Sequence, residues 1–308
     1  MATPEALVKS LLYMCDHRGF LQLTEECYNN RWTPAQITLT TDSTQVAKLN
    51  ETDLEFYKFL FTFLAVAEKM VNLNIEVIVK EFECHDISHY YAEQEAMENI
   101  HGKVYANILG MFFDRDTEQQ LKYTLSVVED PALRKKIGWL NHRVSHATER
   151  SHKTLLFLLI EGIFFVASFY SISLLRSRGL MSNVCLANDY ISRDESLHTK
   201  AAAMLYNTVI QPHEKPSRDW IASLFKEAVD IEFEFISSKG HGVSGLNLCK
   251  IRQFLEAAAD AILHNIHLPP IFNTPPPDCP MFYICYTKNT NFFERENSDY
   301  VNTIQDDL

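Results

Sequence analysis

The sequence predicts an all-α protein, and three observations support that class. Only 9 glycines and 11 prolines occur among 308 residues, well below the roughly 12% that these turn-forming residues contribute on average. From Asn50 to about residue 266 the apolar residues recur at helical spacing, and no segment shows the sustained alternation of a strand. A hydrophobic share of 46% with 22% charged residues is typical of a globular chain with a large core.

The helical elements are expected to begin after an N-terminal arm. Residues 1–49 form this arm, in which Trp32 is the one prominent anchor. The first strong helix begins at Asn50, an N-cap residue followed three positions later by Asp53. Further helical segments are expected at about 75–113, 116–127, 131–146, 151–176, 184–209, 217–239 and 246–266.

Proline marks the end of the helical body. Six of the eleven prolines lie between Pro269 and Pro280, and no glycine follows Gly245. The residues beyond are polar with isolated apolar side chains, a composition typical of a flexible terminal segment. We therefore expect a helical domain over residues 1–267, and a proline-rich segment with a flexible tail over 268–308.

Charge and cysteine content argue against two broad classes, nucleic-acid-binding proteins and secreted proteins held by disulfides. Lys and Arg number 28 against 40 Asp and Glu, which gives a net charge of -12. Direct nucleic-acid binding is not expected, because it needs dense positive charge. The seven cysteines include no C-x-x-C pair, and the N-terminus lacks a basic region followed by a long apolar run. A reducing intracellular compartment is therefore expected.

One segment, residues 155–175, is apolar and long enough to cross a bilayer. Glu161 lies within it, and an acid near the centre of a lipid-facing helix costs roughly 2.5 to 3.5 kcal/mol. A helix that is apolar on all faces is also what the centre of a large helical protein requires. A buried core helix is therefore favoured over a membrane span.

Two expected helices carry the same four-residue word, E-x-x-H. The first runs from Glu98 to His101, and the second from Glu195 to His198. Residues three apart share one face of a helix, so each word directs a carboxylate and an imidazole the same way. A single E-x-x-H motif is weak evidence, because chance and salt bridges on helix surfaces often produce it. Two words on separate helices, with the embedded acid Glu161, favour a metal centre.

The ligand count points to two metal ions. Helical bundles hold such a pair with one acid from each of two helices and an E-x-x-H word from each of two others, as in the di-iron and di-manganese carboxylate proteins. Glu161 supplies one of the single acids. Glu68, an acid in an otherwise apolar helix, is the candidate for the other.

A competing pattern, His85 to His89, has the i,i+4 spacing of a zinc-protease pair. Asp86 replaces the glutamate of that motif, and its shorter side chain would hold a general base at the wrong distance. No third metal ligand is apparent either. A zinc site is not expected there.

With these residues, the sequence resembles the small subunit of class I ribonucleotide reductase, in particular the short herpesvirus type and most of all its gammaherpesvirus members. The resemblance extends from Trp32 to Leu308. It implies a ferritin-like bundle with extra helices and a flexible C-terminal tail, and two iron ions per chain that are oxo-bridged when oxidised. Glu68 stands where cellular members usually carry aspartate, which leaves its binding mode open. The implied iron ligands are Glu68, Glu98, His101, Glu161, Glu195 and His198.

The resemblance also implies that Tyr105 bears a radical. This tyrosine lies four residues after His101, and helical geometry places it on the ligand face. Without the two E-x-x-H motifs, Tyr105 would be interpreted as an ordinary packed core tyrosine. Phe165, Phe169 and Ile191 match the apolar pocket that the family builds around this phenol, although each would also pass as an ordinary core residue.

Radical transfer over a long distance is implied by three further matches. Trp32 resembles the family's tryptophan relay, and Asp194 resembles the acid that bonds toward the indole. His101 links that pair to the metal. Tyr300 resembles the mobile tail tyrosine that passes the radical to the partner.

The implied function is that of a radical-generating subunit. It would use dioxygen to form the Tyr105 radical, which a separate large subunit, bound through the C-terminal tail, uses to reduce ribonucleoside diphosphates for viral DNA replication. A homodimer within a heterotetramer, in the host-cell cytoplasm, is implied as well. The alternative is another ferritin-like di-iron protein, either an oxygenase or oxidase or an iron store. An iron store would have no use for Trp32 or Tyr300, and an oxygenase would act without a large subunit.

Overall fold

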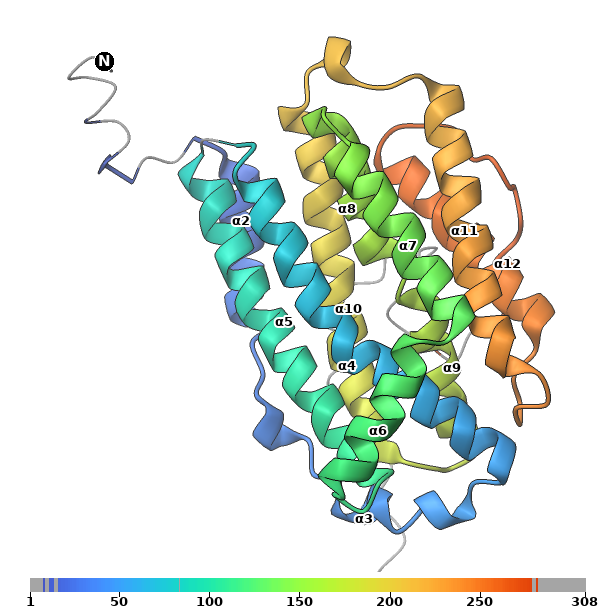
Figure 1. Ribbon diagram of the computed structural model, residues 1–308. Coiled ribbons are helices and arrows are strands. Elements are labelled where there is room, and N and C mark those ends of the chain that lie inside the picture. Colours follow the sequence, from blue (N-terminus) through green and yellow to red (C-terminus); the bar gives the residue numbers. More distant parts are fainter. Residues whose placement is uncertain (1–7, 9–10, 14–15, 83, 279–280, 282–308) are drawn as a thin grey trace, which may run out of the picture.

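The computed structural model describes residues 8, 11–13, 16–82, 84–278 and 281. Within these residues every regular element is a helix, and no strand occurs (Figure 1). The predicted all-α class is therefore confirmed.

Four long helices form the centre of the fold. They are α4 (Glu51–Val79), α5 (His85–Met111), α8 (Arg150–Gly162) and α10 (Ser182–Met204). Figure 1 shows them running side by side; α4 packs along α5, and α8 packs on α10 and α4.

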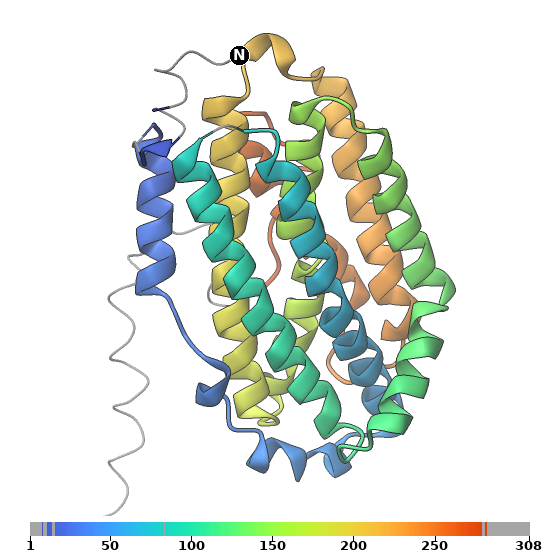
Figure 2. The same cartoon turned by 60° about the vertical axis from the view of Figure 1, so that its left-hand side comes forward.

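The remaining helices cover this central group. Figure 2 shows α2 (Arg18–Asn29) along the outside of α5, in an arm that the apolar pattern did not mark as helical. The C-terminal helices α11 and α12 pack together, and α7 lies against α11. The covering elements also include α3 (Thr40–Ser43), α6 (Thr117–Val128), α7 (Pro131–His146), α9 (Val166–Ser177), α11 (Arg218–Gly240), α12 (Leu248–Asn265) and a π-helical turn at Leu205–Val209.

Side-chain caps explain where several of these helices begin. The Asn50 side chain accepts a hydrogen bond of 2.8 Å from the backbone N–H of Asp53, which confirms the predicted start of α4. Asp130 caps α7 ahead of Pro131, whose missing N–H costs nothing at a helix start. Each such cap contributes about 1 kcal/mol.

The predicted boundary between the first two long helices was placed too early. Instead of ending near residue 74, α4 continues to Val79, and a short turn leads to His85. In this turn the N–H of Phe82 donates to the carbonyl of Val79, and the Phe82 side chain is buried. Core packing of Phe82, rather than a breaker residue, thus sets the boundary.

The predicted single helix over 151–176 is wrong, because the structure divides it. The N–H groups of Ile163 and Phe164 both donate to the carbonyl of Leu159, and regular helix resumes only at Val166. Helical spacing gave no sign of this break, since the residues on both sides of it are apolar on every face.

The stretch Arg150–Ser177 is long and apolar enough to cross a membrane by composition. Its most apolar window lies entirely inside the protein. The expectation of a core segment rather than a membrane span thus agrees with the structure.

Candidate metal centre

Six acidic and histidine side chains from the four central helices meet in the middle of the bundle. They form two groups of four, and within each group one ligand atom per residue lies within 4.8 Å of the others. Two residues, Glu98 and Glu195, belong to both groups, and all six are at most 3% exposed. The structure therefore brings together the whole set expected from the sequence. The first group is Glu68, Glu98, His101 and Glu195; the second is Glu98, Glu161, Glu195 and His198.

Close helix packing brings Glu161 into this cluster. The next residue, Gly162, has no side chain, and a Cβ built on it would lie 2.5 Å from Cδ1 of Ile262 and 3.2 Å from Cγ2 of Thr199. Those residues belong to α12 and α10. A side chain at 162 would therefore require the Ile262 side chain to move, so the glycine permits the close approach of α8, α10 and α12 next to Glu161.

Both histidines turn the same ring nitrogen toward the carboxylates. Nδ1 of His101 lies 3.0 Å from Glu98 and 3.2 Å from Glu195. Nδ1 of His198 lies 2.9 Å from Glu98 and 3.3 Å from Glu195. Each E-x-x-H word thus folds its carboxylate and its imidazole onto one point, as the i,i+3 spacing predicts.

Burial and neighbouring carboxylates raise the pKa values of several residues in the cluster. Burial, and then the Glu98 carboxylate, raises the pKa of Glu68; burial, and then Glu195, raises that of Glu161. Burial lowers the pKa of His198, but the surrounding carboxylates outweigh it and hold the pKa well above its ordinary value. Protons here take the place of positive charge, and a metal ion would displace them.

Several polar atoms in the cluster have no hydrogen-bond partner among the described residues. They include both carboxylate oxygens of Glu68 and Nε2 of His198. Unpartnered buried carboxylate oxygens cost free energy unless a cation occupies them. The donor set, oxygen with imidazole nitrogen, is the one that first-row transition metals accept. The residues therefore fit a pair of metal ions.

One residue of the cluster escaped the sequence analysis. The side-chain amide of Gln94 donates to Glu161 at 3.0 Å and to Glu98 at 3.2 Å, and it is fully buried. It lies four residues before Glu98, on the same face of α5, which is the signal that could have found it. Gln94 ties the acids of α5 and α8 together.

Metal removal is expected to lower the stability of the protein, because it leaves the cluster without its cations. At metal concentrations about 100 times the dissociation constant, binding stabilises the folded state by about 2.7 kcal/mol, and we expect a thermal midpoint about 5 °C higher than with chelator. Thermal unfolding with and without added ferrous iron measures this. The variant Glu161→Ala should lose most of the increment, and an equal midpoint in wild type with and without chelator would contradict a metal centre.

Trp32 and the centre are joined through one carboxylate oxygen. The indole N–H of Trp32 donates to Oδ2 of Asp194 at 2.7 Å, and Nε2 of His101 lies 3.2 Å from that same oxygen. The Trp32 and His101 rings lie nearly parallel, with centroids 6.2 Å apart. Arg193 holds the other oxygen of Asp194 at 3.2 Å. The three expected relay residues are therefore in contact.

Tyr105 is buried beside the carboxylates of the first group. Its hydroxyl has no hydrogen-bond partner among the described residues. Burial, followed by the charges of Glu68, Glu195 and Glu98, raises its pKa well above the ordinary value. Its nearest recorded ring neighbour is Phe61, at 6.4 Å between centroids, a contact that the sequence did not indicate.

The three residues expected to line an apolar pocket around this phenol are all buried. Phe165 and Phe169 stack with ring centroids 6.1 Å apart, and Ile191 lies on α10. Tyr300 lies outside the described residues, so its placement stays a prediction.

The His85 to His89 pattern has a structural explanation. The Tyr28 hydroxyl lies 2.9 Å from Nε2 of His89, and the Tyr13 ring packs on His85 at 5.6 Å between centroids. The metal-ligand groups found among the described residues include neither histidine. These side chains attach the N-terminal arm to α5.

A helical bundle with two buried groups of carboxylates and histidines, joined by two shared acids, is the architecture of ferritin-like di-metal carboxylate proteins. A family model described as the small chain of ribonucleotide reductase matches residues 10–280. The chain belongs to the ribonucleotide reductase small-chain family.

Herpesvirus proteins are among its close relatives. A ribonucleoside-diphosphate reductase small subunit of Saimiriine herpesvirus 2 is 58% identical over 98% of this chain and 99% of its own length. The corresponding proteins of Epstein-Barr virus and varicella-zoster virus are 54% and 40% identical over 98% and 91% of this chain, and over 100% and 92% of their own lengths. The expected likeness to the herpesvirus type, and to its gammaherpesvirus members, is confirmed.

Solved structures agree on the fold. The Rnr4 homodimer of Saccharomyces cerevisiae superposes with a TM-score of 0.78 at 23% identity, over 92% of this chain and 87% of that one. A dimanganese(II)-NrdF of Streptococcus sanguinis gives 0.76 at 18% identity, over 84% of this chain and 92% of that one. The family match and the herpesvirus relatives, rather than these structures, show that the chain is the small subunit of an oxidoreductase that works with a large subunit.

Proposed function

We propose that this chain generates a stable radical at Tyr105 and supplies it to a large subunit that reduces ribonucleoside diphosphates to deoxyribonucleotides. The observation that carries the proposal is the pair of buried ligand groups sharing Glu98 and Glu195, with the phenol of Tyr105 beside the first group. When bound, two ferrous ions would supply electrons to dioxygen, and dioxygen would be the oxidant whose reduction allows Tyr105 to be oxidised.

The roles of the side chains follow from their contacts. Glu68 and His101 would hold one ion, Glu161 and His198 the other, and the shared acids would bridge them. Asp194 fixes the ring orientation of His101 by binding its Nε2, so that Nδ1 stays directed at the centre; such partners of a ligating histidine are a general feature of metal sites.

Exclusion of water protects the phenol. Tyr105 is 1% exposed, and Phe165, Phe169 and Ile191 are 2% exposed or less. A radical on the Tyr105 ring would therefore be shielded from reductants in solution. The Tyr105 hydroxyl has no hydrogen-bond partner among the described residues.

The proposed exit route uses His101, Asp194 and Trp32, which the hydrogen bonds to Oδ2 of Asp194 already connect. Trp32 is 5% exposed, the most exposed of these three side chains. From there the route would continue to Tyr300 in the segment 268–308, which would bind the large subunit as an extended peptide. We place the helical domain at residues 1–267, and expect a homodimer within a heterotetramer in the host-cell cytoplasm.

Metal analysis and electron paramagnetic resonance on the same sample test the proposal. We expect two iron ions per chain and a phenoxyl signal after ferrous iron is added in air. A protein that binds two irons yet gives no phenoxyl signal would contradict the radical function while leaving the metal centre intact.

Replacing Tyr300 with phenylalanine should retain the Tyr105 radical and large-subunit binding but abolish turnover, because phenylalanine has no hydroxyl proton to release on oxidation. Turnover with purified large subunit, the radical signal and subunit affinity are the three measurements. Tyr286→Phe is the matched control within the same segment and should retain turnover. Normal turnover in Tyr300→Phe would remove Tyr300 from the route.

A further inference from the structure

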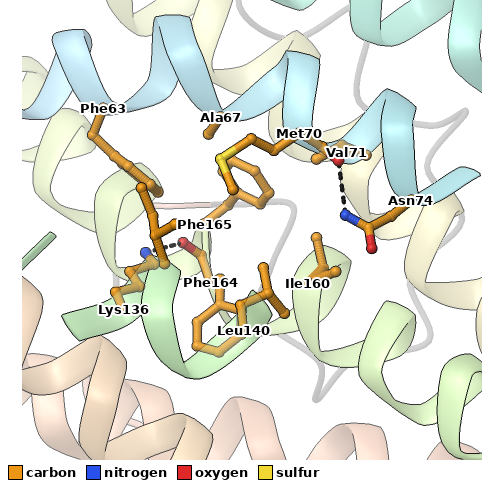
Figure 3. Close-up of a pocket in the computed structure, with 11 residues that line it drawn as sticks. Phe63, Ala67, Met70, Val71, Asn74, Lys136, Leu140, Ile160, Phe164 and Phe165 are labelled. Carbon is orange, nitrogen blue, oxygen red and sulfur yellow. Dashed lines mark hydrogen bonds between the residues drawn. The ribbon is translucent and has the colours of Figure 1, made fainter. Parts of the chain in front are cut away.

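An apolar cavity of about 40 Å³ lies between α4, α7 and the break that follows α8 (Figure 3). Its floor includes Ala67, Ile160 and Phe165, which are buried. Its mouth includes residues that are only half-buried: Met70, Ile137 and Leu140. The cavity thus leads from the surface between α4 and α7 toward the interior.

The walls of this cavity offer little to a water molecule. The Lys136 ammonium donates to the Phe164 carbonyl at 2.8 Å and pairs with Glu232. The Asn74 amide nitrogen donates to the carbonyl of Met70 at 2.8 Å, as Figure 3 shows. A bound water needs two to four polar partners, whereas apolar cavities stay dry and take up apolar gases such as xenon.

The floor of the cavity includes the direct sequence neighbours of two candidate metal ligands. Ala67 directly precedes Glu68 and Ile160 directly precedes Glu161, and consecutive Cα atoms are only 3.8 Å apart. The Phe165 ring stacks on Phe63, also in the lining, and on Phe169, each at 6.1 Å between centroids. The cavity therefore lies against the same stretches of α4 and α8 that carry Glu68 and Glu161.

The centre needs such an entrance because its six ligands are at most 3% exposed. Dioxygen is small, uncharged and apolar, so it partitions into a dry apolar cavity without losing hydrogen bonds. We propose that this cavity binds dioxygen and is the point at which it enters the bundle. The inference rests on the proposed function for its co-substrate, and no bond forms or breaks in the cavity itself.

Xenon tests the cavity without any metal. Crystals of the metal-free protein under xenon pressure should show a xenon atom among Ala67, Ile160 and Leu140. In Leu140→Trp, whose indole would fill the mouth, the xenon site should be lost. Leu121→Trp, at a residue on α6 that is 61% exposed, is the matched control and should keep it. Ordered water in the cavity, or no xenon there in wild type, would overturn the proposal.

The rate of reaction with dioxygen tests delivery. After ferrous loading, the rate of radical formation at limiting dioxygen should fall by about tenfold in Leu140→Trp, which corresponds to roughly 1.4 kcal/mol of added barrier. The final radical yield should be unchanged, and Leu121→Trp should react as wild type does. If Leu140→Trp does not fold, Ile137→Phe narrows the same mouth.

The two measurements separate this inference from the proposed function. If Leu140→Trp reacts with dioxygen at the wild-type rate, the cavity is not the entry site for dioxygen, and the proposed radical function is unaffected. A protein that forms no radical at all but binds xenon here would contradict the proposed function, and oxygen consumption by the ferrous protein would then carry the rate test.

Discussion

Replacing Tyr105 with phenylalanine is expected to abolish both the radical signal and turnover, while the metal content stays at the wild-type level. The reason is that only the hydroxyl is removed, and it contacts no hydrogen-bond partner among the described residues. Deleting a buried hydroxyl that bonds nothing leaves no orphaned partner, so the free energy of unfolding should change by no more than about 1 kcal/mol. Electron paramagnetic resonance, metal analysis and a turnover assay with the large subunit measure the three outcomes.

The chain offers a closely matched control in Tyr91. This tyrosine is also fully buried on α5, and its hydroxyl likewise has no hydrogen-bond partner within the part of the chain that the structure describes. Tyr91→Phe therefore makes the same chemical change at the same depth and should retain the radical and turnover. A phenoxyl signal that survives in Tyr105→Phe and disappears in Tyr91→Phe would show that the radical has been assigned to the wrong residue.

Lys136→Met is expected to destabilise the protein by about 3 to 5 kcal/mol, the usual cost of removing one partner of a buried ion pair. Lys136 is 5% exposed, and its ammonium lies 2.5 Å from Glu232 and 4.0 Å from the centre of the Phe63 ring. It also donates to the Phe164 carbonyl in the break between α8 and α9. The substitution leaves Glu232 and that carbonyl buried without their donor. Urea unfolding measures the loss.

Two variants check the origin of that loss. Lys135→Met removes the neighbouring lysine, whose pair with Glu234 is about half exposed on both sides, and should cost less than about 1 kcal/mol. The double variant Lys136→Met with Glu232→Leu removes both charges and should recover much of the stability. A double variant as unstable as Lys136→Met would show that the loss does not come from the unpaired acid.

The same pair gives a pH dependence with a definite sign. Burial raises the pKa of Glu232 to about 7, even though the Lys136 charge lowers it. Without Lys136 only the upward effect remains, and the folded-state pKa rises further above its unfolded value. Such an acid stabilises the folded state below the unfolded pKa and loses that contribution as the pH rises through the folded pKa. The deficit of Lys136→Met should therefore grow as the pH rises above about 7.

The sequence was most informative where one side chain had no place in an ordinary helix. Glu161, an acid in a long apolar stretch, and the two E-x-x-H motifs predicted five of the six ligands, because helical spacing fixes which residues share a face. Glu68, an acid in another apolar helix, completed the set. The structure brings all six ligands together. The roles of Tyr105 and Trp32 came instead from the family resemblance, since a buried tyrosine or tryptophan is common in any core.

The features that escaped prediction depend on contacts between distant segments. The break after Gly162 involves a lysine from α7, and the break leaves no mark in a sequence that is apolar on every face. Spacing on α5 could have placed Gln94 beside Glu98, but its contact with Glu161, 67 positions away, is one that local spacing cannot reveal. The α4 boundary likewise depends on the burial of Phe82. In each case tertiary packing, rather than local propensity, decided the outcome.

The two shared acids, Glu98 and Glu195, also fix when the protein is able to take up metal during its life. Both ligand groups include Glu195, so neither is complete until the ribosome has made more than the first half of the chain and α10 has docked against α5 and α8. A nascent chain that ends before α10 carries at most an acid cluster with one histidine. Metal binding by either complete group therefore depends on the folding of α10, and shorter nascent chains offer only part of each ligand group.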